Sequence, residues 1–238
     1  MNILGVKIDN LERNEMLLKM MDFLAEEKFH QIATINPEFI VEAEKNDEFK
    51  KILNDCDLNI ADGIGIKFAF WRLGKNLKFR MAGVDLMREI LKIANIKKLK
   101  IFLVTSSRGL STWEKTRNTI LENHPDLIVD GINLKKNGVL GEDIRSKLSD
   151  FEIIFCNFGA PDQEKFLYSL KNLKNGKIKL TMGIGGGFDF LTENQKRAPI
   201  WMRKAGLEWL WRFIRQPWRW KRIWNAVIVF PIKIIFNA

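Results

Sequence analysis

The sequence has 238 residues, of which 46% are hydrophobic and 29% charged, a balance that argues against disorder and suffices for one substantial core. The N-terminus has no positively charged start followed by a long apolar stretch, so we expect no secretory signal and a cytosolic protein. Its net charge of +10 is concentrated late in the chain, because residues 196–238 carry ten basic residues and one acid, Glu208.

Short apolar runs alternate with longer helical patterns along most of the chain. In chain order we expect strands at about 30–35, 57–61, 99–104, 126–130, 152–157 and 178–183. Helices are expected at about 11–27, 37–46, 64–73, 85–97, 111–123, 141–149 and 161–173. This alternation predicts βαβ units, and therefore an α/β fold built on a mainly parallel sheet.

The last forty residues have a different character. They hold six of the eight tryptophans, and we expect one helix from Pro199 to about residue 216 and a second from Pro217 to about residue 230. The apolar run at 226–236 is shorter than the ~20 residues that cross a bilayer. We predict a catalytic domain at 1–195 and a basic, Trp-rich helical appendage at 196–238. The appendage suits a segment that lies on anionic lipids, the alternative being a core-packed helix with a solvated basic face.

Four loops follow predicted strands: residues 34–37, 61–65, 158–164 and 183–189. In a parallel sheet the carboxyl ends of the strands share one edge, where ligands bind, so we expect the four loops to form one site. Asp62 lies in the second loop. Its carboxylate is placed either to approach a substrate or to cap the helix that follows.

The glycines Gly185, Gly186 and Gly187 allow backbone N–H groups to approach a phosphate, although many folds need such a turn for steric reasons alone. A dinucleotide site would require an acidic residue at a strand end about 20 positions later. Glu208 has nearly that spacing but lies inside the tryptophan-rich helix, which argues against an NAD-dependent oxidoreductase. Asp55-Cys56-Asp57 matches an Asp-x-Asp metal motif, but its place at a strand entrance favours a solvated turn. No metal site and no nucleic-acid partner are predicted.

Several motifs follow one another in a fixed order: Thr34-Ile-Asn-Pro, Ala61-Asp-Gly, Arg80 before Gly83-Val-Asp-Leu, Phe158-Gly-Ala-Pro-Asp-Gln-Glu, the glycine run, Arg197-Ala-Pro, Gly206-Leu-Glu-Trp-Leu-Trp-Arg and Gln216-Pro-Trp-Arg. In this order and spacing they resemble the WecG/TagA/CpsF glycosyltransferases, from about residue 4 to 224. The resemblance implies a Rossmann-like enzyme with helices on both faces of its sheet, which needs no metal or other cofactor.

The resemblance also implies the reaction. It predicts transfer of N-acetylmannosamine, with inversion, from UDP-ManNAc to the 4-hydroxyl of GlcNAc on a polyprenyl diphosphate, as in the wall teichoic acid linkage unit. We expect the enzyme at the inner face of the cell membrane, with homo-oligomers left open. Alternatives are another donor, UDP-ManNAc uronic acid or UDP-glucose, and a non-catalytic membrane-surface module that binds nucleotide.

Residue roles follow from the same resemblance. It assigns Asp62 as the general base, with Thr34, Arg80 and Gln163 in the substrate pocket. Further predicted site residues are Asn36, Glu164, Gly185, Gly187 and Phe188 for substrate, and Arg212, Arg219 and Arg222 for the diphosphate. Without a metal, these arginines would neutralise the departing UDP, because guanidinium groups bind diphosphate oxygens at two points.

Overall fold

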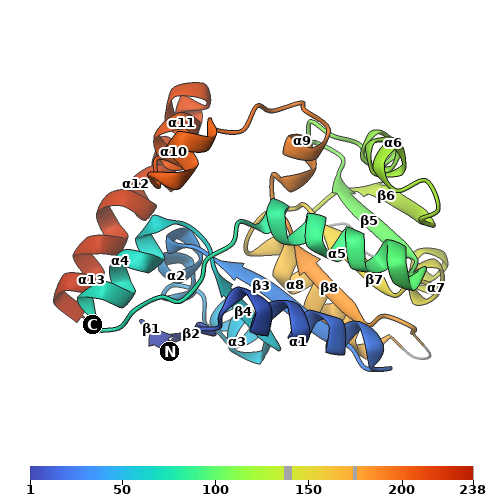
Figure 1. Ribbon diagram of the computed structural model, residues 1–238, viewed down its shortest axis with the longest axis horizontal. Helices are drawn as coiled ribbons and strands as arrows, with labels where there is room; N and C mark the ends of the chain where they lie inside the picture. The colour runs from blue at the N-terminus through green and yellow to red at the C-terminus, as the bar shows by residue number, and fades with distance from the viewer. Residues whose placement is uncertain (137–140, 174–175, 238) are drawn as a thin grey trace.

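The computed structural model describes residues 1–136, 141–173 and 176–237 and shows a six-stranded sheet with helices on both faces (Figure 1). In spatial order the strands are β4 (Leu58–Ala61), β3 (His30–Ile35), β8 (Leu180–Gly183), β7 (Ile153–Cys156), β5 (Ile101–Ser106) and β6 (Val129–Leu134). All neighbouring pairs are parallel. The α/β fold with a parallel sheet, expected from the sequence, is confirmed.

Side chains alternate between the two faces of the sheet. In β7, Ile153 and Phe155 join the core under α1 (Arg13–Ala25), α5 (Gly83–Lys97) and α6 (Trp113–Asn123). Ile154 and Cys156 of the same strand face the opposite core, which is covered by α7 (Glu142–Ser149) and α8 (Asp162–Ser169). A further core cluster lies against β3 and β4. It includes residues of the antiparallel pair β1 (Asn2–Ile3) and β2 (Val6–Lys7).

Two helices follow β3 before the chain returns to the sheet. Asn36 caps α2 (Pro37–Ala43) by accepting a hydrogen bond from the N–H of Phe39, and Pro37 suits the first helical position because it has no N–H to satisfy. The second helix, α3 (Asp47–Asp55), lies outside the predicted elements and is capped by Asn46. Strand β6 also differs, since it begins three residues later than predicted, where it pairs with β5.

The C-terminal helices are α10 (Ile200–Lys204), α11 (Glu208–Arg215), η2 (Pro217–Arg219), α12 (Trp220–Trp224), the π-helical turn η3 (Asn225–Val229) and α13 (Phe230–Asn237). The prediction of one helix from Pro199 to residue 216 is wrong, because Gly206 turns the chain with φ of +77°. An added Cβ at Gly206 would lie 2.8 Å from Cβ of Ile64, so glycine also permits the close approach of these helices to α4 (Ile64–Arg72).

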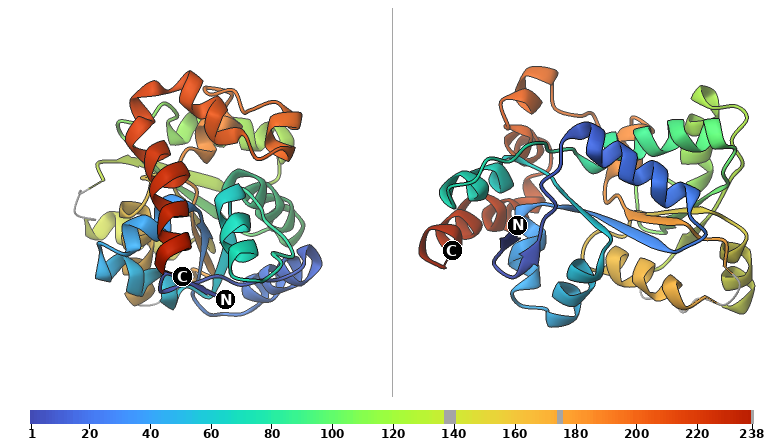
Figure 2. Two further views of the ribbon diagram at one scale, coloured as in Figure 1. Left: turned by 90° about the vertical axis from the view of Figure 1, so that its left-hand side faces the viewer. Right: turned by 60° about the horizontal axis from the view of Figure 1, so that its bottom comes forward.

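Helix α13 packs on α2 and α4, and Figure 2 shows the C-terminal helices running across one end of the molecule. Phe230 and Ile234 are fully buried in the same core cluster as residues of α2 and α4. This end is the carboxyl edge of the sheet, from which the chain enters both α2 and α4. None of the helices in the described part of the chain is long and apolar enough to cross a membrane. The division at residue 195 stays a prediction.

Candidate active site

Asp62 directly follows β4 at the carboxyl edge of the sheet. Its backbone N–H donates a hydrogen bond to the carbonyl oxygen of Ile35 (2.8 Å), which ends the neighbouring strand β3. Gly63 comes next with φ of +84°, a left-handed conformation that turns the chain into α4. Strand pairing and this turn therefore fix the backbone of the half-buried aspartate.

The electrostatic surroundings of Asp62 come from three other segments. Burial raises the pKa of Asp62 from 3.8 to about 6, while Arg212 lowers it, Glu208 raises it, and Arg80 and Arg197 lower it by smaller amounts. An aspartate with this pKa is ionised near neutral pH and is more basic than an exposed one. These are the properties of a general base.

Thr34 and Arg80 lie at the same edge. Thr34 is buried in β3, and its Oγ1 would be 3.2 Å from a Cβ added to Gly83, the first residue of α5. Arg80 precedes α5, and its Nη2 donates a hydrogen bond to the carbonyl oxygen of Arg203 in α10 (3.3 Å). The structure thus brings Asp62, Thr34 and Arg80 together from three segments.

Gln163 joins two strand-end loops. Its Oε1 accepts hydrogen bonds from the backbone N–H groups of Gly159 and Gly185, both at 3.0 Å, and its Nε2 donates to Oε1 of Glu164 (2.6 Å). Glu164 is fully buried, and burial raises its pKa to about 8. The Gln163 side chain therefore holds the loops after β7 and β8 together, and the Glu164 side chain orients that of Gln163. Their contact with substrate stays a prediction.

The glycine turn follows β8. Gly185 has φ of +50° and open space where a Cβ would be, whereas a Cβ on Gly187 would lie 3.2 Å from Cβ of Ile184. Phe188, in α9 (Gly187–Leu191), is fully buried in the core beneath the turn. Asn36 uses its Oδ1 to cap α2. The open backbone is therefore at Gly185, while Phe188 and Asn36 support the surrounding structure.

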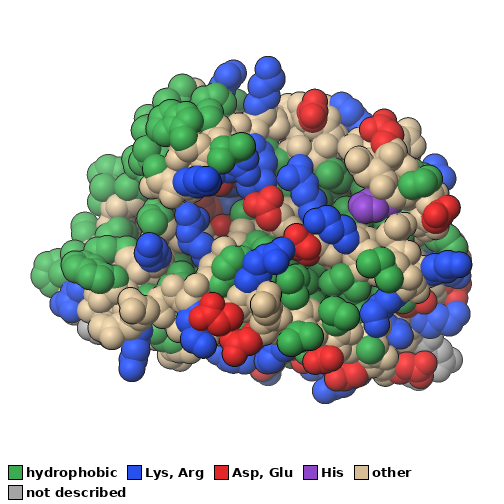
Figure 3. Space-filling view, viewed as in Figure 1, with side chains coloured by type: hydrophobic (Ala, Val, Ile, Leu, Met, Phe, Trp, Pro, Cys, Tyr) green, Lys and Arg blue, Asp and Glu red, His purple; other side chains and the backbone are tan. Residues whose placement is uncertain are grey.

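The three predicted appendage arginines have different partners. Arg212 pairs with Glu208 (3.1 Å) and lies over the ring of Phe190, and Arg222 binds Glu38 of α2 through Nε (2.7 Å). Arg219 is half-buried and forms no side-chain hydrogen bond or ion pair within the described residues, and burial and its two arginine neighbours lower its pKa. Figure 3 shows basic side chains gathered around a hollow between these helices and α5.

Two features of this edge have no role predicted from the sequence, the contact between Arg197 and Asp85 and the negative charge of Glu208. Arg197 is largely buried and binds both carboxylate oxygens of Asp85, at 2.6 and 3.0 Å, which lowers the pKa of Asp85 against the effect of burial. Glu208 supplies the negative charge beside Arg212 and Asp62. The sequence does contain one indication that Glu208 is unusual, since it is the lone acid of a strongly basic segment.

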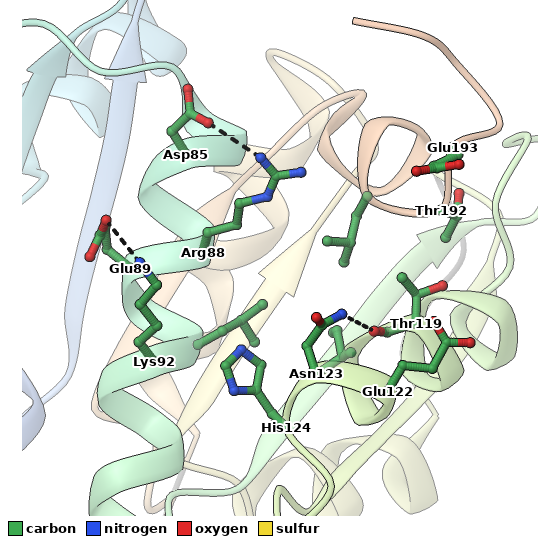
Figure 4. A pocket seen from close by; sticks show the side chains of 13 residues that line it. Asp85, Arg88, Glu89, Lys92, Thr119, Glu122, Asn123, His124, Thr192 and Glu193 are labelled. Carbon is green, nitrogen blue, oxygen red and sulfur yellow. Dashed lines mark hydrogen bonds and ion pairs between the residues drawn. The ribbon is translucent and has the colours of Figure 1, made fainter.

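A groove of about 940 Å³ runs between α5, α6 and the residues after α9, and Asp85 is one of the residues that line it (Figure 4). Charged side chains of mixed sign line it, among them Arg88, Glu89, Lys92 and Glu193. None of the predicted site residues lines this groove. The Asp55-Cys56-Asp57 motif lies apart from the site as well, and Asp57 accepts a hydrogen bond from the N–H of Gln31 at the start of β3 (3.0 Å).

The sequence matches the model of the "Glycosyl transferase WecG/TagA/CpsF family" over residues 1–238. It is similar to the Bacillus subtilis (strain 168) protein named N-acetylglucosaminyldiphosphoundecaprenol N-acetyl-beta-D-mannosaminyltransferase, with 31% identity over 88% of this chain and 83% of that protein. A Staphylococcus aureus (strain MRSA252) protein of the same name is 30% identical over 98% of this chain and 91% of its own length. The chain therefore belongs to the WecG/TagA/CpsF family of glycosyltransferases.

Proposed function

We propose that this enzyme transfers N-acetylmannosamine from UDP-ManNAc to the 4-hydroxyl of GlcNAc on a polyprenyl diphosphate, forming a linkage unit of teichoic acid or a related surface polysaccharide. The names of its relatives describe an N-acetylmannosaminyl transfer to an undecaprenol-diphosphate-linked acceptor. The observation that carries the proposal is Asp62, a half-buried aspartate with a pKa of about 6 at a sheet edge surrounded by arginines.

In this mechanism Asp62 removes the proton of the acceptor hydroxyl while its oxygen attacks the anomeric carbon of the donor. The bond from that carbon to the UDP oxygen breaks on the opposite side of the sugar, so the configuration inverts. Arg212 and Arg219 neutralise the negative charge that collects on the departing diphosphate. Arg219 suits this task because, among the described residues, it forms no hydrogen bond or close ion pair with a carboxylate, and Glu38 and Asp189 act on its pKa only through their charge.

A donor panel tests the reaction. The protein is incubated with a short-chain lipid-diphosphate-GlcNAc and, in separate reactions, with UDP-ManNAc, UDP-ManNAc uronic acid and UDP-glucose, and products are identified by mass spectrometry. We expect a disaccharide product with UDP-ManNAc. The Asp62→Asn variant should form almost none while binding UDP nearly as tightly as wild type. A product from another donor alone would overturn the choice of sugar.

A non-catalytic nucleotide-binding module is the competing function from another class. Titration calorimetry with UDP, combined with the same product assay, separates the two. UDP binding without any product from the three donors would favour the module.

We also propose that the enzyme works on the inner, anionic surface of the cell membrane. Several large apolar side chains of α4, η2, α12 and α13 are at least half exposed to solvent: Trp71, Trp218, Trp220, Trp224, Ile232 and Phe236. Vesicle sedimentation tests this with phosphatidylglycerol and phosphatidylcholine vesicles. Changing Trp218 and Trp224 together to Ser should release the protein from the anionic vesicles, whereas Ile96→Ser, at an exposed site on α5, should not. Equal binding by both variants would refute the role of the tryptophans.

A further inference from the structure

Glu208 is the one acidic residue in the otherwise basic segment 196–238. It stands in the first turn of α11, is three-quarters buried, and pairs with Arg212 one turn later (3.1 Å). A carboxylate in the first turn of a helix is favoured by the helix dipole, and an i, i+4 pair adds a small stabilisation. These local effects explain the pair but not its place beside Asp62.

Arg212 has few other restraints. Its guanidinium lies over the ring of Phe190 at 5.4 Å, and Glu208 is the only hydrogen-bond acceptor for its side chain in the described part of the chain. Its Nε is buried without a partner among the same residues. A long side chain held by one ring and one carboxylate loses its orientation when the carboxylate is removed, because the other rotamers then become accessible.

Arg212 also interacts with the proposed base. Among the cations of the described residues that lower the pKa of Asp62, Arg212 has a larger effect than Arg80 and Arg197, and the charge of Glu208 raises that pKa. Arg212 therefore interacts with two carboxylates. It forms an ion pair with Glu208 on its own helix, and its charge lowers the pKa of Asp62 at the end of β4. Without Glu208, Arg212 would be free to pair with Asp62 directly, which would make Asp62 a weaker base and take Arg212 away from the diphosphate.

We propose that Glu208 is a positioning residue, which holds the guanidinium of Arg212 over Phe190 and prevents it from forming a closed ion pair with Asp62. This inference rests on the proposed function, in which Asp62 is the base and Arg212 faces the diphosphate. Glu208 does not touch the reacting atoms in this scheme. It acts by sharing Arg212 and by adding negative charge near Asp62.

The test compares wild type with Glu208→Gln and Glu208→Asp, with Glu142→Gln at an exposed position of α7 as the matched control. The measurement is kcat/KM for the lipid-linked acceptor between pH 5 and pH 8. On the acid side of the pH profile, kcat/KM falls as the proposed base is protonated. In Glu208→Gln we expect this acid limb to move to lower pH by about half a unit or more, because the loss of a nearby negative charge lowers the pKa of Asp62. We also expect its kcat to fall at least about tenfold, because the diphosphate-binding arginine is misplaced. Glu208→Asp should recover the position of the limb and part of the rate.

A second measurement separates this inference from the proposed function. Carbon NMR of the Asp62 carboxyl group, recorded against pH in wild type and Glu208→Gln, reports its titration without any turnover. A lower midpoint in the Gln variant supports the inference even if no donor gives product, in which case the proposed function alone fails. An unchanged midpoint, or a Gln variant with the wild-type limb and rate, overturns the inference. Thermal melting of each variant shows that the comparison is between folded proteins.

Discussion

The raised pKa of Asp62 predicts how the enzyme responds to acid. With a pKa of about 6, roughly one Asp62 side chain in eleven is ionised at pH 5, whereas an aspartate at its ordinary 3.8 would be more than about nine-tenths ionised there. A base must be deprotonated to act. Acidification from pH 7.5 to pH 5 should therefore lower kcat/KM about tenfold, and an unperturbed aspartate would leave it nearly unchanged.

Initial rates at subsaturating acceptor, followed by mass spectrometry at half-unit pH intervals, measure this effect. Asp62→Asn should reduce kcat by about 10²- to 10⁴-fold and should lack the limb near pH 6. Melting temperatures recorded at each pH ensure that unfolding does not produce the loss. A wild-type profile that stays flat down to pH 5, or a limb that survives in Asp62→Asn, would refute the assignment of Asp62 as base.

Three further predictions concern the supports of the site. Glu164 has a pKa of about 8 in the fold against an ordinary 4.5, so wild type should lose stability as pH rises between these values, by up to ~1.4 kcal/mol per pH unit, and Glu164→Gln should abolish that slope in melting experiments. Arg197→Lys breaks the two-point contact with Asp85 and should cost about 1 kcal/mol in urea unfolding, whereas Arg88→Lys, 3.7 Å from the same carboxylate, should change little. Phe230→Ala should destabilise the fold by about 3–5 kcal/mol in the same assay, because it leaves a cavity in the fully buried contact of α13 with α2 and α4.

The sheet could be predicted from the sequence because its central strands are continuous apolar runs, such as Ile153–Cys156. The edge strand β6 begins later than its apolar pattern indicates, since the apolar residues Leu127 and Ile128 precede it while Asp130 and Asn133 belong to it. Its position is set by pairing with β5, which a local pattern does not record. Helix α3 carried a local signal, with the Asn46 cap and buried Phe49, Ile52 and Leu53 at helical spacing.

The candidate site likewise has one part that the sequence predicts and another that it does not. Topology alone allows the loops at 34, 62, 163 and 185 to be placed on one edge, because all follow parallel strands. The use of Gln163 to clamp two backbone N–H groups depends on how close the loops after β7 and β8 approach, which the sequence does not specify. The Arg197–Asp85 contact spans more than a hundred residues and likewise requires coordinates.

The C-terminal helices are tied to the site rather than merely attached beside it. Arg222 binds Glu38 in the first turn of α2, Arg80 binds the carbonyl oxygen of Arg203, and Phe230 fills the core beside α4. These contacts join the helices to the segments that follow β3 and β4, the two strands that end beside Asp62. The proposed base thus lies at the end of a strand of the sheet, and the arginine with the largest effect on its pKa lies in the C-terminal helices. Movement of these helices away from the body would separate the base from the cations proposed to receive the leaving group, so docking of the appendage and assembly of the proposed catalytic site are one event.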